Sequence, residues 1–312
     1  MILDEILLHK RREVALRRAQ RPLESLEAVI ALAASEGGPL VARSAEAQAS
    51  QAIGGHPPMG SDRAFVETAT SSSSSKSRTI PAVRPFAALR QPGVSIIAEF
   101  KRKSPSGGQL MSEASSAGEI ASMYAENGAA ALSVLTDERF FGGTDADLVE
   151  ARAASRLPVL RKDFVIDPYQ AYEARALGAD AVLLIVRALS SVELTALLDL
   201  SHRLGMDALV ETHSENEVRR ALDAGARIIG VNNRDLDTLV TDVTLAPRLR
   251  PLVPPDRIFV AESGVSSPDQ ILMLSEAGAD AVLVGESLLR AADPGEQLRR
   301  LVAAGAPRGT RV

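Results

Sequence analysis

The sequence contains no cysteine and no tryptophan, and aromatic residues make up only 3% of its 312 positions. The absence of cysteine excludes disulfide bridges, thiolate catalysis and zinc–sulfur sites. With so few aromatic rings, a stacking surface for single-stranded nucleic acid is not expected. The four histidines show no metal-ligand spacing, so the sequence predicts no metal site.

The chain also lacks an excess of positive charge and a long apolar run. Its formal net charge is −5, whereas a nucleic-acid partner would require clustered cations. No apolar run approaches the roughly 18 residues of a membrane span. An acidic N-terminus followed by Lys10-Arg11-Arg12 has the wrong order for a secretory signal. We therefore expect a cytoplasmic protein with no nucleic-acid or membrane partner.

A Gly-Ala pair followed by an apolar run occurs four times, with the glycines about 50 residues apart at Gly128, Gly178, Gly225 and Gly278. Glycine readily takes the left-handed conformation that ends many helices. A short run rich in Val, Ile and Leu is typical of a parallel strand that is covered on both faces. Each repeat therefore predicts the end of a helix and the strand that follows it.

Further strands are predicted between these repeats, at Val94 to Glu99, Pro158 to Arg161, Asp207 to Glu211 and Arg257 to Ala261. Helical segments separate the strands, at Glu113 to Asn127, Pro168 to Leu177, Ser190 to Leu204, Ser214 to Ala224 and Pro268 to Ala277. Strand and helix thus alternate eight times over about 210 residues. This pattern favours an α/β fold, a (β/α)8 TIM barrel at 81–305 with a tail at 306–312. An open doubly wound sheet is the alternative.

The stretch before the barrel has two parts of different character. Residues 1–35 carry apolar side chains near helical spacing, so we expect one amphipathic helical extension packed on the barrel, with its charges on a solvated face. Residues 36–80 contain the run Ser71 to Ser75 and few large apolar side chains, which predicts a low-complexity, disordered insertion. A short helix at 85–90 then leads into the first strand.

Polar residues follow the predicted strands at the end where a barrel of this type carries its reacting groups. They are Glu99 and Lys101 after the first strand, Lys162 after the third, Glu211 after the fifth, Asn232 and Arg234 after the sixth, and Glu262 after the seventh. A lone lysine at such a place is more often solvent-exposed than catalytic, and a lone glutamate often caps the next helix. Two lysines and two glutamates together would meet at one mouth, where mixed charges tune pKa values for acid–base chemistry.

Glycine-containing loops follow the last two strands, at Ser263-Gly264 and Gly285-Glu286. With a short helix at Ser287 to Ala291, they match the phosphate site that is common in this fold. Backbone N–H groups at a helix start bind phosphate without a charged side chain. We expect the Glu286 carboxylate to point outward, since it would repel phosphate. The alternative is that both glycines are simple turn residues.

At these residues the sequence resembles the indole-3-glycerol-phosphate synthase family, over about residues 81–303 and 1–30. The motifs include Glu99-x-Lys101-x-Lys103-Ser104-Pro105-Ser106, Leu160-Arg161-Lys162-Asp163-Phe164, Gly230-Val231-Asn232-Asn233-Arg234 and Val284-Gly285-Glu286-Ser287. The first two motifs are specific, whereas the glycine loops alone would fit many phosphate-binding barrels.

The resemblance implies ring closure of 1-(2-carboxyphenylamino)-1-deoxyribulose 5-phosphate in tryptophan biosynthesis, with loss of carbon dioxide and then of water. No metal or other cofactor is implied. Lys162 would be the general acid and Glu211 the general base. Lys101 and Glu99 would be supporting charges, and proton delivery shared by the two lysines stays open as an alternative.

The resemblance also implies how the phosphorylated small-molecule substrate is held. Asn232 would orient it through hydrogen bonds, and Arg234 would supply a cation to one of its anionic groups. The phosphate region would be lined by Ser104, Ser263, Gly264, Gly285 and Glu286. We expect a monomer or a weak homo-oligomer.

Two departures from the family pattern stand out. The segment 36–80 replaces a shorter link, and Ala261 stands where serine is common. His213 follows Glu211 closely but is expected to be a loop residue. Rival hypotheses are a phosphate-binding barrel isomerase, such as phosphoribosylanthranilate isomerase, which would need a cysteine or aspartate pair, and a catalytically silent barrel, which would leave strand ends vacant.

Overall fold

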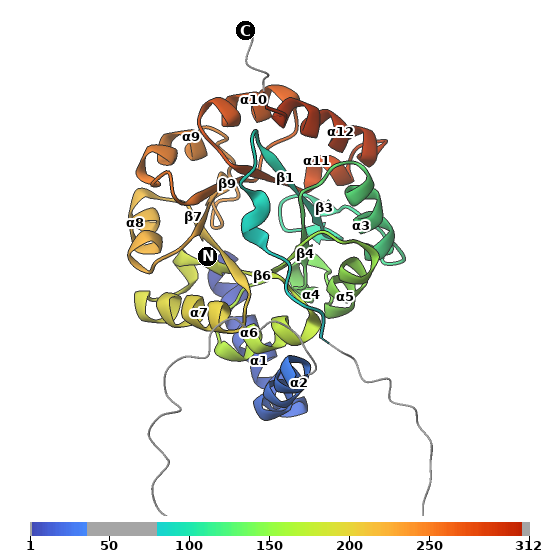
Figure 1. Cartoon of the computed structure of the whole chain (residues 1–312), viewed down its shortest axis with the longest axis vertical. Coiled ribbons are helices and arrows are strands. Elements are labelled where there is room, and N and C mark those ends of the chain that lie inside the picture. Colours follow the sequence, from blue (N-terminus) through green and yellow to red (C-terminus); the bar gives the residue numbers. More distant parts are fainter. Residues whose placement is uncertain (1, 36–79, 308–312) are drawn as a thin grey trace, which may run out of the picture.

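The computed structural model describes residues 2–35 and 80–307. Eight parallel strands close into a barrel in the order β1-β10-β9-β8-β7-β6-β5-β4, so that the last strand pairs with the first (Figure 1). The barrel strands are β1 Ser95–Phe100, β4 Ala131–Leu135, β5 Val159–Lys162, β6 Ala181–Ile185, β7 Asp207–Thr212, β8 Ile228–Asn232, β9 Ile258–Glu262 and β10 Ala281–Val284. The predicted (β/α)8 barrel is confirmed, and the doubly wound sheet is excluded.

Helices follow the strands and cover the outside of the barrel (Figure 1). They are α3 Ala117–Glu126, α4 Glu138–Phe141, α5 Asp145–Ala154, α6 Pro168–Leu177, α7 Ser191–Arg203, α8 Glu215–Asp223, α9 Leu245–Leu249, α10 Pro268–Glu276, α11 Glu286–Leu289 and α12 Pro294–Gly305, with 3-10 turns η2 Val186–Ala188 and η3 Arg250–Leu252.

Local sequence signals set the helix ends. Asp167 and Ser267 accept hydrogen bonds from backbone N–H groups in the first turns of α6 and α10. Gly178 ends α6 at φ +91°, in the left-handed region. The predicted start at Glu113 is too early, because Ser116 is the residue that caps α3.

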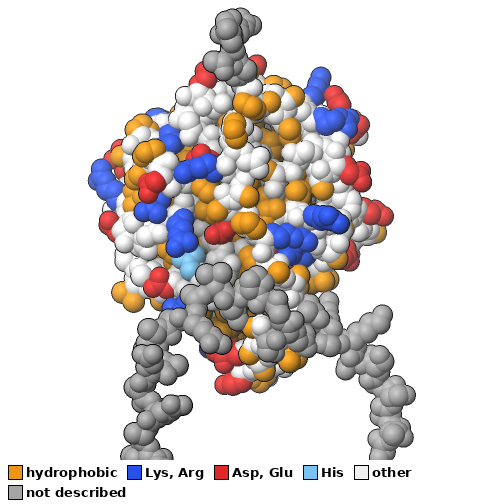
Figure 2. All heavy atoms as spheres, in the orientation of Figure 1, with side chains coloured by type: hydrophobic (Ala, Val, Ile, Leu, Met, Phe, Trp, Pro, Cys, Tyr) orange, Lys and Arg blue, Asp and Glu red, His pale blue; other side chains and the backbone are white. Residues whose placement is uncertain are grey.

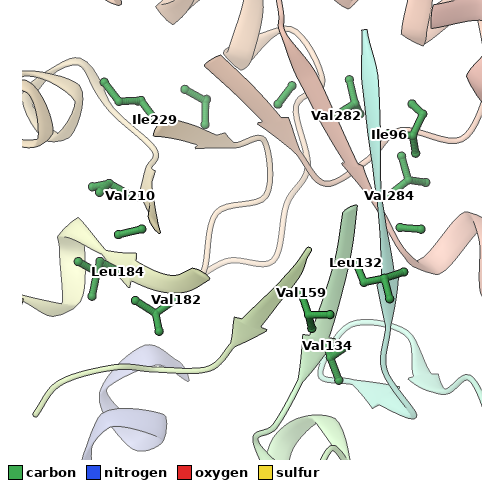
Figure 3. Close-up of a cluster of buried hydrophobic side chains, with 14 of the residues drawn as sticks. Ile96, Leu132, Val134, Val159, Val182, Leu184, Val210, Ile229, Val282 and Val284 are labelled. Carbon is green, nitrogen blue, oxygen red and sulfur yellow. The ribbon is translucent and has the colours of Figure 1, made fainter. Parts of the chain in front are cut away.

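Side chains of each strand alternate between the barrel interior and the helix layer. The outward-facing side chains form the larger apolar cluster, and Figure 3 shows some of them around the outside of the barrel, including Ile96, Val182 and Val284. Inward-facing residues form a second cluster, which includes Ile97, Leu160, Leu209 and Leu283. Ala261 is buried in the outer cluster, so this departure from the family pattern lies in the barrel wall.

The turn η1 Phe86–Leu89 closes the amino-terminal end of the barrel and is the cyan coil in front of the strands in Figure 1. Phe86 and Leu89 are buried in the inner cluster. The Asp207 carboxylate accepts hydrogen bonds from the N–H groups of Phe86 and Ala87, at 2.9 and 3.0 Å. The short helix expected at 85–90 is confirmed, and a charged acceptor fixes its start.

Two more aspartates at this end bind backbone N–H groups. Asp180 and Asp280 each stand directly before a strand, and each accepts a hydrogen bond at 2.8 Å from the beginning of the preceding strand, at Val159 and Phe259. Two of the Gly-Ala repeats thus carry a carboxylate that fixes the register of neighbouring strands. On the face seen in Figure 2, acidic and basic side chains are interspersed around the rim.

The N-terminal extension contains two helices, α1 Ile2–Gln20 and α2 Leu23–Ser35, so the prediction of one helix was wrong. Pro22 stands between them, and a proline inside a helix removes a hydrogen-bond donor and clashes with the preceding turn. Leu3 and Ile6 of α1 are buried in the inner apolar cluster.

The expectation that the charges of this extension form a solvated face was wrong for one residue. Lys10 in α1 has an exposed fraction of 0%. Its Nζ lies 2.9 Å from carboxylate oxygens of Asp137 and Asp163, at the carboxyl ends of β4 and β5. This lysine therefore anchors α1 to the barrel.

The insertion expected at 36–80 lies outside the described residues except for Ile80, which is buried. Most of the tail at 306–312 also lies outside them. A small hairpin of β2 Lys103–Ser104 and β3 Gly108–Gln109 follows β1 and was not predicted. Within residues 2–35 and 80–307, no helix is both long and apolar enough to cross a membrane.

Candidate active site

A cavity of about 380 Å³ opens at the carboxyl ends of the barrel strands. Every site residue predicted from the sequence lines it: Glu99, Lys101, Ser104, Lys162, Glu211, Asn232, Arg234, Ser263, Gly264, Gly285 and Glu286. The geometry arises because each inward-facing position at a strand end points into the same mouth. The structure thus brings together side chains that are far apart in the sequence.

Two lysine–glutamate groups form the floor of the cavity. Lys101 Nζ lies 2.6 Å from Glu99 Oε1, and the hydroxyl of Ser133 donates a hydrogen bond of 3.2 Å to the other Glu99 oxygen. Lys162 Nζ lies 3.2 Å from Glu262 Oε2 and 3.5 Å from Glu211 Oε2. The expected meeting of two lysines with two glutamates is therefore found, together with a third glutamate.

Burial and mutual attraction fix the charges of this cluster. Burial opposes the charge of Glu99, but Lys101 and Lys162 outweigh it and hold the pKa of Glu99 below its usual value. Burial also opposes the charge of Lys162, yet the surrounding carboxylates, Glu262 first, raise its pKa above the ordinary value. Lys162 is therefore an ammonium and Glu99 a carboxylate at neutral pH.

Glu262 behaves differently from the other glutamates. Burial raises its pKa to about 8, and the neighbouring Glu211 adds to the effect while Lys162 opposes it. Its Oε1 is buried and has no hydrogen-bond partner among the described residues. Glu262 therefore holds its proton more tightly than an ordinary glutamate does.

Two interior glycines make room for these carboxylates. A Cβ placed on Gly230 would lie 2.1 Å from Glu262 Oε1. A Cβ placed on Gly285 would lie 2.6 Å from Glu99 Oε1. Both distances are far below van der Waals contact, so any larger residue would displace the glutamate. Gly285 was predicted for phosphate binding, and the structure places it against Glu99 as well.

The loops after β9 and β10 form the opposite side of the cavity. Ser263 and Gly264 both have left-handed backbones, at φ 66° and 81°. Gly285 precedes α11, which begins at Glu286 and not at Ser287 as predicted. The Glu286 carboxylate lies 2.9 Å from Arg290 and 3.7 Å from Arg234. It is thus turned toward arginines, while still bordering the cavity.

Several parts of the site were not predicted as site residues. Glu262 stands at a strand end like the others, so the same positional rule was sufficient to find it. The apolar wall was harder to foresee, because it combines Ile2 and Ile6 of α1 with Phe141 and Phe164. No periodic pattern in the sequence indicates that these segments come into contact in the folded chain.

His213 is a loop residue, as expected, and lies beside the mouth. Its Nδ1 lies 2.7 Å from the backbone oxygen of Asn232, and its Nε2 lies 3.3 Å from an Asp235 carboxylate oxygen. These contacts connect the loop after β7 with the loop after β8, which carries Arg234.

Comparison with known proteins decides the family. The family model described as indole-3-glycerol phosphate synthase matches residues 63–301. The chain belongs to the indole-3-glycerol phosphate synthase family. This family comprises decarboxylating carbon–carbon lyases of tryptophan biosynthesis, which act on a phosphorylated small molecule, so the predicted activity is confirmed. The isomerase and silent-barrel hypotheses are excluded.

Similar proteins cover most of the chain. An indole-3-glycerol phosphate synthase of Parafrankia sp. is 55% identical over 227 residues, which is 73% of this chain and 84% of the relative. Indole-3-glycerol phosphate synthase 2 of Streptomyces coelicolor is also 55% identical, covering 71% of this chain and 86% of the relative. A thiamine phosphate pyrophosphorylase from Pyrococcus furiosus shares only the fold, with a TM-score of 0.52 and 16% identity over 69% of this chain and 96% of that one.

Proposed function

We propose that this chain closes the indole ring of 1-(2-carboxyphenylamino)-1-deoxyribulose 5-phosphate, with Lys162 as the general acid. The ring carbon that carries the carboxylate attacks the ketone carbon, and the ketone oxygen takes a proton from Lys162 to become a hydroxyl. The carboxylate leaves as carbon dioxide, which restores the aromatic ring. The observation that carries this assignment is the Lys162 ammonium, held at the cavity floor between the Glu211 and Glu262 carboxyl groups.

The new hydroxyl then takes a second proton from a lysine ammonium of the cavity floor and leaves as water, while Glu211 takes the proton that must leave the ring system in this step. Glu211 is 3% exposed and lies in the same cavity as Lys162, so both groups can reach one bound molecule. Each general acid or base supplies about 10²- to 10⁴-fold in rate. Holding the two reacting carbons in contact supplies a further large part of the rate acceleration.

The other residues bind and orient the substrate. Lys101 and Glu99 act as supporting charges that position the substrate and the proton donor, and Asn232 provides hydrogen bonds. Arg234 offers its guanidinium to an anionic group, since its present partners Ser106 and Glu286 lie at the cavity rim. The phosphate region is assigned to Ser104, Ser263, Gly264, Gly285 and the backbone N–H of Glu286.

Two wider proposals accompany this function. The described cavity combines residues of α1 with residues of the barrel, which supports a catalytic domain at 81–305 working with the 1–35 extension. We propose a monomer or weak homo-oligomer. A phosphorylated substrate does not cross membranes unaided, which supports a cytoplasmic location shared with the reaction that supplies it. Size-exclusion chromatography across a concentration series tests the oligomeric state.

The function is tested by supplying the carboxyphenylamino ribulose phosphate and following indole fluorescence. We expect Lys162→Ala to lower kcat by about 10²- to 10⁴-fold, because the general acid is lost, while substrate binding is retained. Lys103→Ala is the matched control, since it removes a lysine of β2 that does not line the cavity. Near-normal turnover of Lys162→Ala would refute the assigned role, and an inactive wild-type protein would refute the function.

A further inference from the structure

Lys10 of α1 is buried completely and surrounded by carboxylates. Its Nζ lies 2.8 Å from Glu13, 2.9 Å from Asp137 and 2.9 Å from Asp163. The ammonium thus forms ion pairs with three carboxylates and donates a hydrogen bond of 2.8 Å to Glu13. Burial opposes the charge of Lys10, but the carboxylates outweigh this and raise its pKa above the ordinary lysine value. The lysine is therefore charged.

Asp163 is the partner that connects Lys10 with the reaction, because it directly follows Lys162. One of its oxygens accepts a hydrogen bond of 2.7 Å from the backbone N–H of Phe164, and the other accepts one of 2.6 Å from the Thr136 hydroxyl. Burial opposes its charge, yet Lys10 and Arg161 lower its pKa to about 2. Asp163 is thus an anion that binds the backbone directly after it and the side chain of Thr136, whose own N–H donates a hydrogen bond of 3.2 Å to the Lys162 carbonyl oxygen.

Asp137, the second barrel partner of Lys10, organises the neighbouring strand end. Its Oδ1 accepts a hydrogen bond of 2.8 Å from the Phe140 N–H and so caps α4. This short helix carries Phe141, which lines the cavity. Lys10 therefore contacts the carboxyl ends of β4 and β5 at the same time, on the side from which α1 adds Leu3 and Ile6 to the cavity wall.

We propose that Lys10 is a positioning residue for the reaction: its ammonium ties α1 to the ends of β4 and β5 and thereby fixes the backbone that presents Lys162 to the substrate. It acts through Asp163 and does not itself line the cavity. Lysines are rarely buried completely unless they are paired, and here the partner Asp163 directly follows the proposed general acid. The inference rests on the proposed function of Lys162.

The test compares Lys10→Met, which keeps the length and apolar stem but removes the charge, with Arg18→Met. Arg18 anchors the same helix through Asp167 at the start of α6, away from Lys162. Displacement of a reacting group by about 1 Å can cost about 100-fold in rate. We therefore expect kcat of the folded Lys10→Met protein to fall by about 10- to 100-fold with a smaller change in KM, and kcat of Arg18→Met to stay within about twofold of the wild type.

A coupled variant separates positioning from simple destabilisation. If Lys10 acts through Asp163, the double variant Lys10→Met with Asp163→Asn loses no more kcat than the worse single variant, whereas independent effects would multiply. If Lys10→Met does not fold, Lys10→Arg replaces it in the same comparisons. A planar guanidinium cannot approach three carboxylates as a compact ammonium does, so we expect the kcat of Lys10→Arg to fall, but by less than the 10- to 100-fold expected of Lys10→Met.

Three results would overturn the inference: an unchanged kcat in the folded Lys10 variant, an equal loss in Arg18→Met, or multiplicative losses in the double variant. Circular dichroism and the melting temperature establish that each protein is folded at the assay temperature. Wild-type turnover is measured first. An active wild type combined with any of these results removes only the role of Lys10, whereas an inactive wild type removes the proposed function.

Discussion

The two ends of the barrel both hold buried or half-buried carboxylates, but different donors bind them. At the closed end, Asp180, Asp207 and Asp280 accept hydrogen bonds from backbone N–H groups. At the mouth, Glu99 and Glu211 face lysine ammonium groups on long side chains. Backbone donors move only if the local structure opens, whereas a lysine can exchange one partner for another. The closed end is therefore suited to stability, and the mouth to chemistry.

Among the variants that test this comparison, Gly285→Ala should lower kcat most, because it alters the mouth of the barrel. Its new Cβ would lie 2.6 Å from Glu99 Oε1 and push that carboxylate away from Lys101. We expect kcat to fall by about 10- to 100-fold, as for other small misplacements of reacting groups. Overpacking should also cost about 1–3 kcal/mol of stability.

The control for this variant is Gly118→Ala in α3, where the new Cβ makes only ordinary contacts at 3.5 Å or more. Steady-state kinetics and thermal melting of both proteins provide the comparison. A Gly285→Ala enzyme with wild-type kcat would show that the position of Glu99 is unimportant.

Asp207→Ala should lower the stability of the protein and leave kcat unchanged, because it alters the closed end of the barrel. It removes the acceptor of the Phe86 and Ala87 N–H groups. Loss of such a cap costs about 1–2 kcal/mol, so we expect the melting temperature to fall by about 2–8 °C, with kcat unchanged at 25 °C. Asp199→Ala, which removes an exposed carboxylate of α7, should shift neither quantity. A fall in kcat without a fall in melting temperature would contradict the assignment of stability to the closed end and of chemistry to the mouth.

The third comparison concerns the pH dependence of stability. Burial raises the pKa of Glu262 to about 8, so between its unfolded value near 4.5 and pH 8 the folded protein holds a proton that the unfolded chain releases. Stability from this group is fully present at low pH and is lost as pH rises toward 8. Glu262→Gln carries no titrating proton, so its stability relative to the wild type should rise over that window. Melting curves at pH 5, 7 and 9 test this, and a constant difference would contradict it.

The fold was predictable because its signals are local and repeated. Each Gly-Ala repeat ended a helix and began a strand, and the strand ends then identified most of the polar cavity residues by their position, whereas Ser104 was assigned only through the family resemblance. The break at Pro22 was also visible in the sequence, since proline interrupts a helix, and the single-helix prediction overlooked it.

What could not be predicted depends on contacts between distant segments. Helical spacing assigns Lys10 to a polar position of α1, but its burial depends on Asp137 and Asp163, which no local pattern connects with it. The raised pKa of Glu262 likewise depends on its burial, and then on how closely Lys162 and Glu211 approach it. The burial and the pKa of a charged residue are hard to predict from the sequence, because its exposure and its partners are set only in the folded chain.

The direction of α1 has a practical consequence for handling the protein. Ile2 borders the cavity, so any purification tag joined ahead of it would leave the chain beside the substrate entrance. Pro307 instead lies next to Gly93, just before β1 begins at the closed end. A tag or surface-immobilisation linker attached after Pro307 would therefore leave the entrance free for diffusion.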